Sequence, residues 1–105
     1  MPAVCREGDT LNTGHECDAV STLDVPGQDK VYSDNILIAR RGDSTVTHNI
    51  RTGTDENGGP ICTPHVATIS GGSEKVFVVN AAIARIGDAV DAGSLTSGSS
   101  KVFSG

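Results

Sequence analysis

Residues 75–88 carry the clearest structural signal in the chain; they read Lys75-Val-Phe-Val-Val-Asn-Ala-Ala-Ile-Ala-Arg-Ile-Gly-Asp88. Apolar, largely β-branched residues on both sides of a tight turn around Asn80-Ala81 predict a β-hairpin that ends in a Gly-Asp exit. Residues 30–43 repeat this pattern without a gap and match it at 8 of 14 positions. An internal repeat this clear governs the interpretation of the whole chain.

Each end of the chain contains half of a further repeat unit. Residues 3–9 end in the same Arg-x-Gly-Asp pattern, and residues 100–103 copy the Lys-Val-Phe that begins the hairpin at 75–88. The simplest geometry is a ring of three units in which the final strand pairs with the first and hides its edges. We therefore predict one domain over residues 1–105, with hairpin units at 30–43, at 75–88, and at 100–105 joined with 3–9.

Composition predicts an all-β fold with little or no helix. Turn-forming residues punctuate the sequence every few positions, and helix signals are poor throughout. With two Phe, one Tyr, no Trp and 13 Gly, large apolar side chains are scarce. A hydrophobic core alone would be marginal, so a cross-link, a metal or a partner is expected. Residues 51–60 are a polar insertion that we expect to form a mobile surface loop.

Several function classes are disfavoured by the sequence. The formal charge is −5 and no basic cluster exists, which argues against nucleic-acid binding. No apolar run approaches the roughly 18 residues of a membrane span, and the N-terminus lacks the apolar segment of a signal peptide. We expect no catalytic residues, because no motif of a zinc protease, serine hydrolase or nucleotide-binding loop occurs. Asp9, Asp43 and Asp88 recur with the repeat and are expected to cap turns.

The three cysteines are interpreted individually. An odd number of cysteines in a chain without a signal peptide argues against a disulfide framework and favours thiol or metal chemistry. Cys5 stands where the repeat has Ala39, so we expect a packing role. Cys17 and Cys62 are both candidates for metal binding.

All three histidines lie in the segments that link the hairpins. His15 follows Asp9 by six residues and His48 follows Asp43 by five, so the two are equivalent positions of successive units. In Cys62-Thr-Pro-His65 the spacing lets a thiolate and an imidazole reach one ion from a single turn.

Together these residues predict a metal site. His15, His48, Cys62 and His65 form a four-ligand set suited to tetrahedral zinc, and four protein ligands would make that zinc structural. Two alternatives stay open. Cys62 could be a small buried hydrophobe, and Cys17 is a rival ligand that ranks lower, although His15-Glu-Cys17 also presents two donors.

The repeated Ile-Ala-Arg-x-Gly-Asp (38–43 and 83–88), the Gly-Ser-x-Lys-Val-Phe lead-ins (72–77 and 98–103) and Cys62-x-x-His65 closely resemble the PAAR-repeat proteins. The resemblance covers nearly the whole chain apart from residues 51–60. It implies a small cone or pyramid of pseudo-threefold hairpins, with a zinc near its apex held by His15, His48, Cys62 and His65. The third linker, residues 89–94, departs from the usual pattern because it lacks a Cys and offers only Asp91 and Ser94.

The resemblance also implies a function. The broad base of the cone would cap a trimeric β-helical spike, one copy per trimer, and form the membrane-piercing tip of a phage tail or of a bacterial type VI secretion system. The chain would then be found in the virion, or in the bacterial cytoplasm before injection, with only transient contact with the target cell's outer membrane. We hypothesise that apolar hairpin residues form the base: Val31, Ile36, Val76, Val78 and Val102.

Two alternative functions remain. The protein could be an adaptor that tethers secreted effectors, with the 51–60 loop as the docking surface. Less favoured is a small zinc hydrolase in which His15, His48 and His65 bind the metal and Glu16 is the base.

Overall fold

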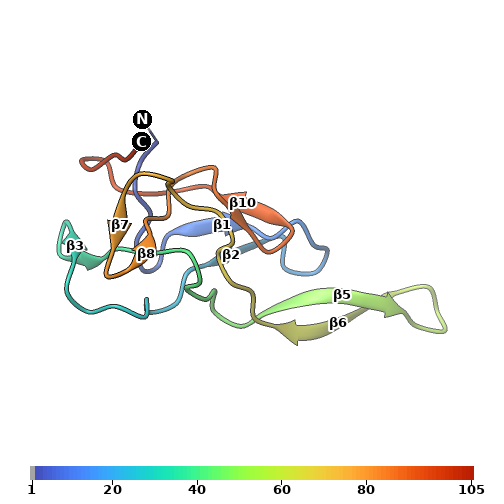
Figure 1. The fold of residues 1–105 in the computed structure, drawn as a ribbon. Helices are drawn as coiled ribbons and strands as arrows, with labels where there is room; N and C mark the ends of the chain where they lie inside the picture. The colour runs from blue at the N-terminus through green and yellow to red at the C-terminus, as the bar shows by residue number, and fades with distance from the viewer. Residues whose placement is uncertain (1) are drawn as a thin grey trace.

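The protein is built from short antiparallel strands (Figure 1). The computed structural model describes residues 2–105, so Met1 of the predicted domain lies outside the described residues. The strands are β1 (Thr10–Asn12), β2 (Val20–Thr22), β3 (Tyr32–Ser33), β4 (Ile36–Leu37), β5 (His48–Thr54), β6 (Pro60–His65), β7 (Phe77–Val78), β8 (Ala81–Ala82), β9 (Ala89–Val90) and β10 (Gly93–Leu95). Residues 2–105 contain no helix, which confirms the predicted all-β class, and hence none long and apolar enough to cross a bilayer.

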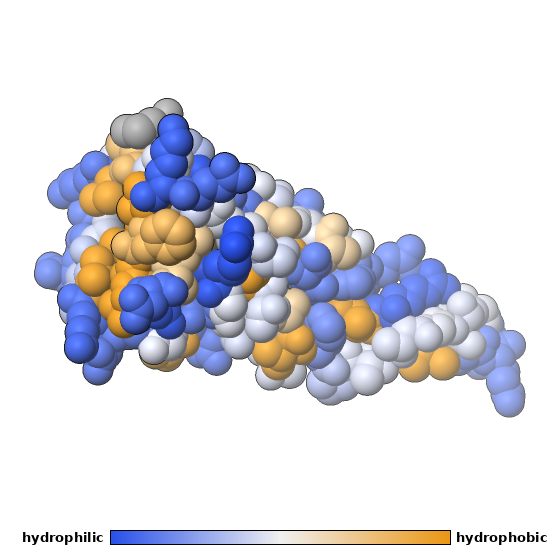
Figure 2. All heavy atoms as spheres, in the orientation of Figure 1, coloured by the Kyte–Doolittle hydropathy of each residue, from blue (hydrophilic) through white to orange (hydrophobic). Residues whose placement is uncertain are grey.

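The molecule is elongated and tapers from a wide end to a narrow one. Its principal extents are 48 × 24 × 21 Å. The hairpins β3–β4 and β7–β8 and both chain ends lie at the wide end, whereas the β5–β6 hairpin projects at the other end (Figure 1). The space-filling view shows the same taper (Figure 2). A four-stranded sheet, in the order β2-β1-β10-β9, lies between them.

A closed ring of three backbone hydrogen bonds joins the three repeat units. Cys5 N–H donates to the Ala84 carbonyl at 2.9 Å, Ala84 N–H to Ala39 at 3.0 Å, and Ala39 N–H to Cys5 at 2.9 Å. All three side chains are at most 1% exposed. We call these residues the axial ring. Because three segments of the chain converge there, only small side chains fit. Cys5 therefore has the packing role expected from its Ala-equivalent position.

The chain ends together form the third hairpin unit. Val4 N–H donates to the Val102 carbonyl at 3.0 Å, as Ile38 N–H does to Val31 and Ile83 N–H to Val76, both within 3.1 Å. Ala3 and Phe103 form a β-bridge beside this bond. The first and last segments therefore pair as the two strands of a continuous hairpin do in the other units.

A second set of contacts between units builds the core. Each pair joins an inner residue of one unit to one of the preceding unit, and all six members are at most 2% exposed. The pairs are Leu11 with Leu95, Thr45 with Leu23, and Val90 with Ile69. The core is thus a narrow column of mostly aliphatic side chains in which no aromatic residue takes part.

The Gly-Asp exits have one structure in all three units. The carboxylates of Asp9, Asp43 and Asp88 accept the backbone N–H of the Arg three residues earlier, at 2.7, 2.7 and 2.8 Å. These bonds confirm the predicted turn-capping role of the aspartates. The glycines before them have φ of +82°, +94° and +93°, a region that only glycine enters without strain.

Two local predictions were wrong. The tight turn of the 75–88 hairpin is formed by Val79 and Asn80, both with positive φ, and not by Asn80-Ala81. Residues 51–60 are not simply a surface loop: half of them belong to β5 and β6, which form the longest hairpin among the described residues. This hairpin, residues 48–65, is called the finger below. Most of its side chains are exposed, so its sequence lacks the apolar-polar alternation by which strands are recognised.

The burial of Cys5 predicts a specific loss of stability at alkaline pH. Burial first, and then the charges of Asp9 and Asp88, raise the pKa of its thiol from 9.0 to about 12. The unfolded chain releases this proton near pH 9 while the folded chain keeps it. The stability that the raised pKa contributes is therefore complete below pH 9 and is lost as pH rises towards 12, by about 1.4 kcal/mol per pH unit.

We expect Cys5→Ala to match the wild type near pH 7, because Ala39 and Ala84 occupy the equivalent positions. At about pH 10.5 the variant should be the more stable by roughly 2 kcal/mol. Urea unfolding of both proteins from pH 7 to 10.5 measures the difference. A difference in unfolding free energy that does not change with pH would refute this account.

Candidate metal centre

Three histidines converge on one carboxylate at the root of the finger. His48 begins β5 and His65 ends β6, and the two are paired in the ladder. His15 follows β1, and Asp91 lies in the two-residue turn between β9 and β10. Asp91 has φ +56°, a conformation that Asp tolerates better than most residues. We call these four side chains the histidine cluster.

The side chains approach Asp91 with the same ring nitrogen. The Nε2 atoms of His15 and His65 lie 2.6 and 3.4 Å from Asp91 Oδ1. His48 Nε2 lies 2.9 Å from Oδ2. His65 meets both other imidazoles edge to face, with ring centroids 5.8 Å from His15 and 5.2 Å from His48. The three rings thus surround the carboxylate with their Nε2 atoms directed inward.

The hydrogen bonds of His48 determine its tautomer. Its Nδ1 lies 3.0 Å from the Val46 carbonyl oxygen, which can only accept, so Nδ1 carries the proton. In the neutral ring the Nε2 lone pair is then free to bind a cation, whereas in the protonated ring Nε2–H donates to the Asp91 carboxylate. Second-sphere hydrogen bonds of this kind, from Nδ1–H to a carbonyl, are the usual way of orienting a metal-binding histidine.

His65 gives a second indication of a cation. Its Nε2 is buried and has no hydrogen-bond partner among the described residues. Buried polar atoms without a partner are rare in folded proteins and call for an explanation. Donor atoms of His15, His65 and Asp91 lie within 4.8 Å of one another, so these residues could hold a metal ion.

The donor atoms are of kinds that zinc binds. Imidazole nitrogen and carboxylate oxygen are common zinc ligands, at about 2.0–2.2 Å. The group whose donor atoms lie within reach of one ion is His15, His65 and Asp91. His15 and His65 share Oδ1, and His48 brings a further nitrogen to the same carboxylate.

The environment of Asp91 keeps it ionised. Burial by itself would raise its pKa, but hydrogen-bonding contacts with His48 and His15, and the charges of His15 and His65, outweigh it and hold the pKa of Asp91 below its ordinary value. Only 6% of its side chain is exposed. A metal ligand must be deprotonated, so the cluster presents the form of Asp91 that binds a cation.

The structure places the four predicted ligands in two groups. His15, His48 and His65 lie together. Cys62 does not join them, because its sulfur is bonded to that of Cys17. The predicted thiolate ligand is therefore wrong for this structure, as is the argument against a disulfide from the odd number of cysteines. The free thiol is Cys5.

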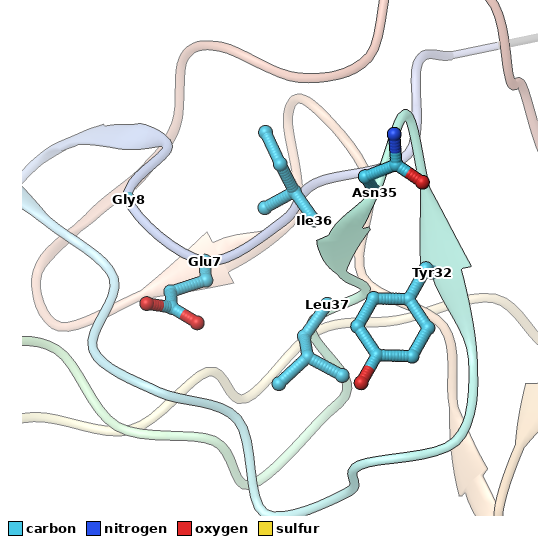
Figure 3. Close-up of a pocket in the computed structure, with 6 residues that line it drawn as sticks. All are labelled: Glu7, Gly8, Tyr32, Asn35, Ile36 and Leu37. Atoms are coloured by element: carbon cyan, nitrogen blue, oxygen red, sulfur yellow. The ribbon is translucent and has the colours of Figure 1, made fainter.

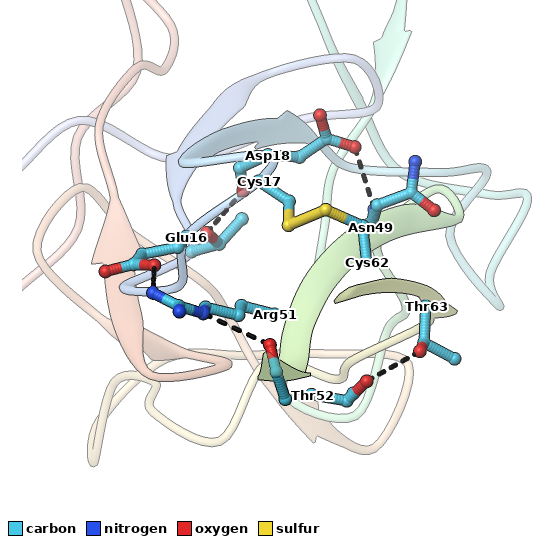
Figure 4. The surroundings of a disulfide bond; sticks show 10 residues. Glu16, Cys17, Asp18, Asn49, Arg51, Thr52, Cys62 and Thr63 are labelled. Atoms are coloured by element: carbon cyan, nitrogen blue, oxygen red, sulfur yellow. Dashed lines mark hydrogen bonds and ion pairs between the residues drawn. A yellow bond between two sulfur atoms is a disulfide. The ribbon is translucent and has the colours of Figure 1, made fainter. Parts of the chain in front are cut away.

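The pairing of strands in the finger brings Cys17 and Cys62 together. Residues 16–18 pair with the outer edge of β5, through a bridge between Cys17 and Ile50, while Cys62 lies on β6 beyond β5 (Figure 4). The two Cα atoms are 6.2 Å apart, within the range that a disulfide spans. The cross-link closes a loop of 45 residues. In the chain-entropy description a loop of that length stabilises the fold by about 4 kcal/mol.

Asp91 is the cluster residue that the sequence analysis left out of the ligand set. Its signal was present, because it lies after the third Gly-Asp exit as His15 and His48 lie after the other two. One Asp among the 13 acidic residues of the chain does not by itself indicate a metal ligand. Its approach to His15 depends on Gly93, where a Cβ would overlap the carbonyl of Asn12, so that β10 can lie close against β1.

An open pocket lies apart from the histidine cluster, beside the first hairpin (Figure 3). The residues that line it are Glu7, Gly8, Tyr32, Asn35, Ile36 and Leu37. Glu7 supplies the one carboxylate of this lining and Tyr32 the one phenol.

Compared with known protein families and with curated proteins, the chain matches no family model and no curated sequence.

Replacing Asp91 should abolish tight metal binding. Asp91→Asn keeps the size of the side chain but removes its charge, so we expect zinc affinity to fall by more than about tenfold. Competition against a chromophoric chelator gives the affinity, and elemental analysis gives the stoichiometry. Asp55→Asn, an exposed carboxylate in the turn of the finger, is the matched control. If Asp91→Asn retained wild-type affinity, Asp91 could not be a ligand.

Proposed function

We propose that this protein is a zinc-stabilised tip that caps a trimeric β-helical spike. The observation that carries the proposal concerns its aromatic residues. The chain has only three, Tyr32, Phe77 and Phe103, and all occupy the same position of the repeat, after Lys-Val or its equivalent. They are 54%, 62% and 49% exposed. We call them the aromatic triad.

This use of aromatic residues points to a binding surface. A small domain with few large apolar residues would normally bury them, because each contributes 150–250 Å² of contact area. Here all three belong to hairpin units at the wide end, joined by exposed Ile36, Val76 and Val102. Large exposed apolar patches on a protein surface mark interaction sites. Three equivalent aromatic anchors suit a partner with three equivalent sockets, which is a trimer.

Two of the residues hypothesised for the base need correction. Val78 is only 7% exposed and packs with Val4, Ile38 and Ile83 in the interior. Val31 packs against the same cluster. Ile36, Val76 and Val102 remain in the proposed base, and the aromatic triad takes the place of Val31 and Val78.

The narrow end supports the mechanical part of the proposal. The finger is about 20 Å long, from six residues in β6 at roughly 3.3 Å each. It is two strands wide, so it cannot contain a core. A structural zinc at its root and the disulfide beside it would hold it in line with the body, since metal-binding energy contributes directly to folding.

On the resemblance to PAAR-repeat proteins, the proposed tip would belong to a phage tail or a type VI secretion machine and would contact a target membrane transiently. The hydrolase alternative loses support because Glu16 is ion-paired with Arg51 at the finger's edge. The adaptor alternative keeps the exposed finger as its docking surface. It predicts capture of effector proteins by the finger, whereas the cap predicts binding at the wide end.

Binding to a trimeric spike tests the proposal. We expect one copy of this chain per three spike chains, by light scattering of the purified complex. Phe77→Ser should weaken binding by about 30-fold, the effect of losing an interface anchor of about 2 kcal/mol. Val20→Ser is the matched control, because Val20 is 65% exposed but lies on β2. A 3:3 complex, or equal affinity of Phe77→Ser and the wild type, would contradict the cap.

Metal removal tests the structural role of zinc independently. A ligand present at 1,000 times its Kd stabilises the folded state by about 4 kcal/mol. A strong chelator should therefore lower Tm by many degrees, and added zinc should restore it. Asp91→Asn should start at the lower Tm and respond to neither. An unchanged Tm of the wild type after complete zinc removal would rule out the structural role.

A further inference from the structure

The Cys17–Cys62 disulfide links the two segments that carry His15 and His65. Cys17 follows His15 by two residues, and Cys62 precedes His65 by three. Between these segments runs β5, which begins with His48. The cross-link passes from one side of β5 to the other, so it ties the segment that follows His15 to β6, which ends with His65 (Figure 4).

Apart from the disulfide, residues 16–18 are held to the finger by hydrogen bonds to β5. Asp18 N–H donates to the Asn49 carbonyl at 3.0 Å, and Asn49 N–H returns a bond to the Asp18 carboxylate at 2.7 Å. Arg51 N–H donates to the Glu16 carbonyl at 3.2 Å, and its side chain pairs with the Glu16 carboxylate. These bonds lie at the exposed surface, where water competes with them. The disulfide is the direct link from this segment to β6.

Both cysteines are exposed. The disulfide therefore fills no core, and a thiol in solution can reach its sulfurs. Exposed disulfides are more readily reduced than buried structural ones. Its position beside the histidine cluster, together with its accessibility, distinguishes it from a purely structural cross-link.

We propose that the Cys17–Cys62 disulfide is a redox latch that positions His15 and His65 and thereby sets the metal affinity of the histidine cluster. The proposal rests on the metal site described above and is independent of the spike partner. Cys17 and Cys62 act as positioning residues and not as ligands. With the latch closed, the cluster is preorganised; with it open, binding must also order the His15 segment against β6.

The chemistry needs only a dithiol as co-reactant. One thiolate of the dithiol attacks one sulfur of the disulfide, forms a mixed disulfide and releases the other cysteine as a thiolate, which takes up a proton. The second thiol of the reductant then attacks the mixed disulfide. Cys17 and Cys62 together gain two electrons and two protons, and the dithiol is oxidised to its own disulfide.

Linkage makes the effect reciprocal. If closing the latch raises metal affinity by some factor, metal binding makes the disulfide harder to reduce by the same factor. A reducing cytoplasm would favour the open latch, and an oxidising exterior the closed one. The finger would then become rigid when the protein leaves the cell.

The first measurement is zinc affinity, by chelator competition, for the oxidised wild type and for Cys17→Ser/Cys62→Ser. We expect the double variant to bind about tenfold more weakly or worse, as with other losses of support around metal ligands. The control is Thr52→Ala, which removes a hydrogen bond of 2.8 Å to Thr63 within the finger but leaves the latch intact. Equal affinities of the oxidised wild type and the double variant would overturn the latch.

Reduced wild type covers the case in which the double variant folds poorly. Its affinity should match that of a weakened cluster, and its cobalt-substituted form should lack a sulfur-to-metal charge-transfer band. Tighter binding together with such a band would mean that the thiolates are ligands, which refutes the positioning role. If no form bound metal at all, the metal centre itself would fail, a result distinct from failure of the latch alone.

The reciprocal measurement uses a dithiol redox buffer with free zinc fixed by a metal buffer. The equilibrium constant for reduction of Cys17–Cys62 should fall on zinc binding by the ratio of the two affinities. Asp91→Asn, which weakens the metal site but retains both cysteines, should show a much smaller shift. A reduction equilibrium of the wild type that zinc does not alter would contradict the proposal.

Discussion

The three hydrogen bonds that join Cys5, Ala39 and Ala84 impose the symmetry of the molecule. Each N–H in this ring finds its acceptor in a different unit, so no unit can satisfy its backbone alone. Because three segments of the chain approach one axis, only the small side chains of Cys and Ala fit there. It also sets the neighbouring inter-unit pairs, such as Leu11 with Leu95. The ring requires one strand from each unit. In the third unit the N-terminal segment supplies that strand with Cys5, and the C-terminal segment pairs with it.

This architecture leaves little room for a conventional core. The column of buried side chains is aliphatic and narrow, and the three aromatic residues lie on the surface. The finger extends past the column, where only backbone pairing is available. There the disulfide stabilises the fold, because it links segments far apart in the chain and so reduces the entropy of the unfolded state. Beside it, the histidine cluster brings three linkers together in the folded state. The candidate metal site and the cross-link therefore lie together at the root of the finger, at the other end of the molecule from the exposed aromatic residues.

Much of this arrangement could be predicted from spacing alone. The repeat located the aspartates that cap the exits, the buried position of Cys5 and the linkers that hold His15 and His48. The role of Cys62 could not be predicted, because its partner depends on the finger. Exposure on both faces gives the residues of the finger no alternation, so nothing in the sequence revealed that β5 lies between Cys17 and β6. The exposure of Val78 was predicted wrongly for a related reason. The residues on either side of it in the chain are exposed, and only packing decides which side chain of a two-residue strand faces inward.

The sequence by itself determined the all-β class, the recurrence of the hairpin and the recurrence of polar residues after each Gly-Asp exit. These are local properties, encoded within about fourteen residues and copied along the chain. Only the tertiary structure decided that Asp91 meets His15, 76 residues away, and that Cys17 bonds to Cys62, 45 residues away. These contacts arise when the units close around the axis, since closure brings linkers of different length and composition to one place. A repeat pattern contains what the units share, whereas the histidine cluster and the disulfide are built from what differs between them.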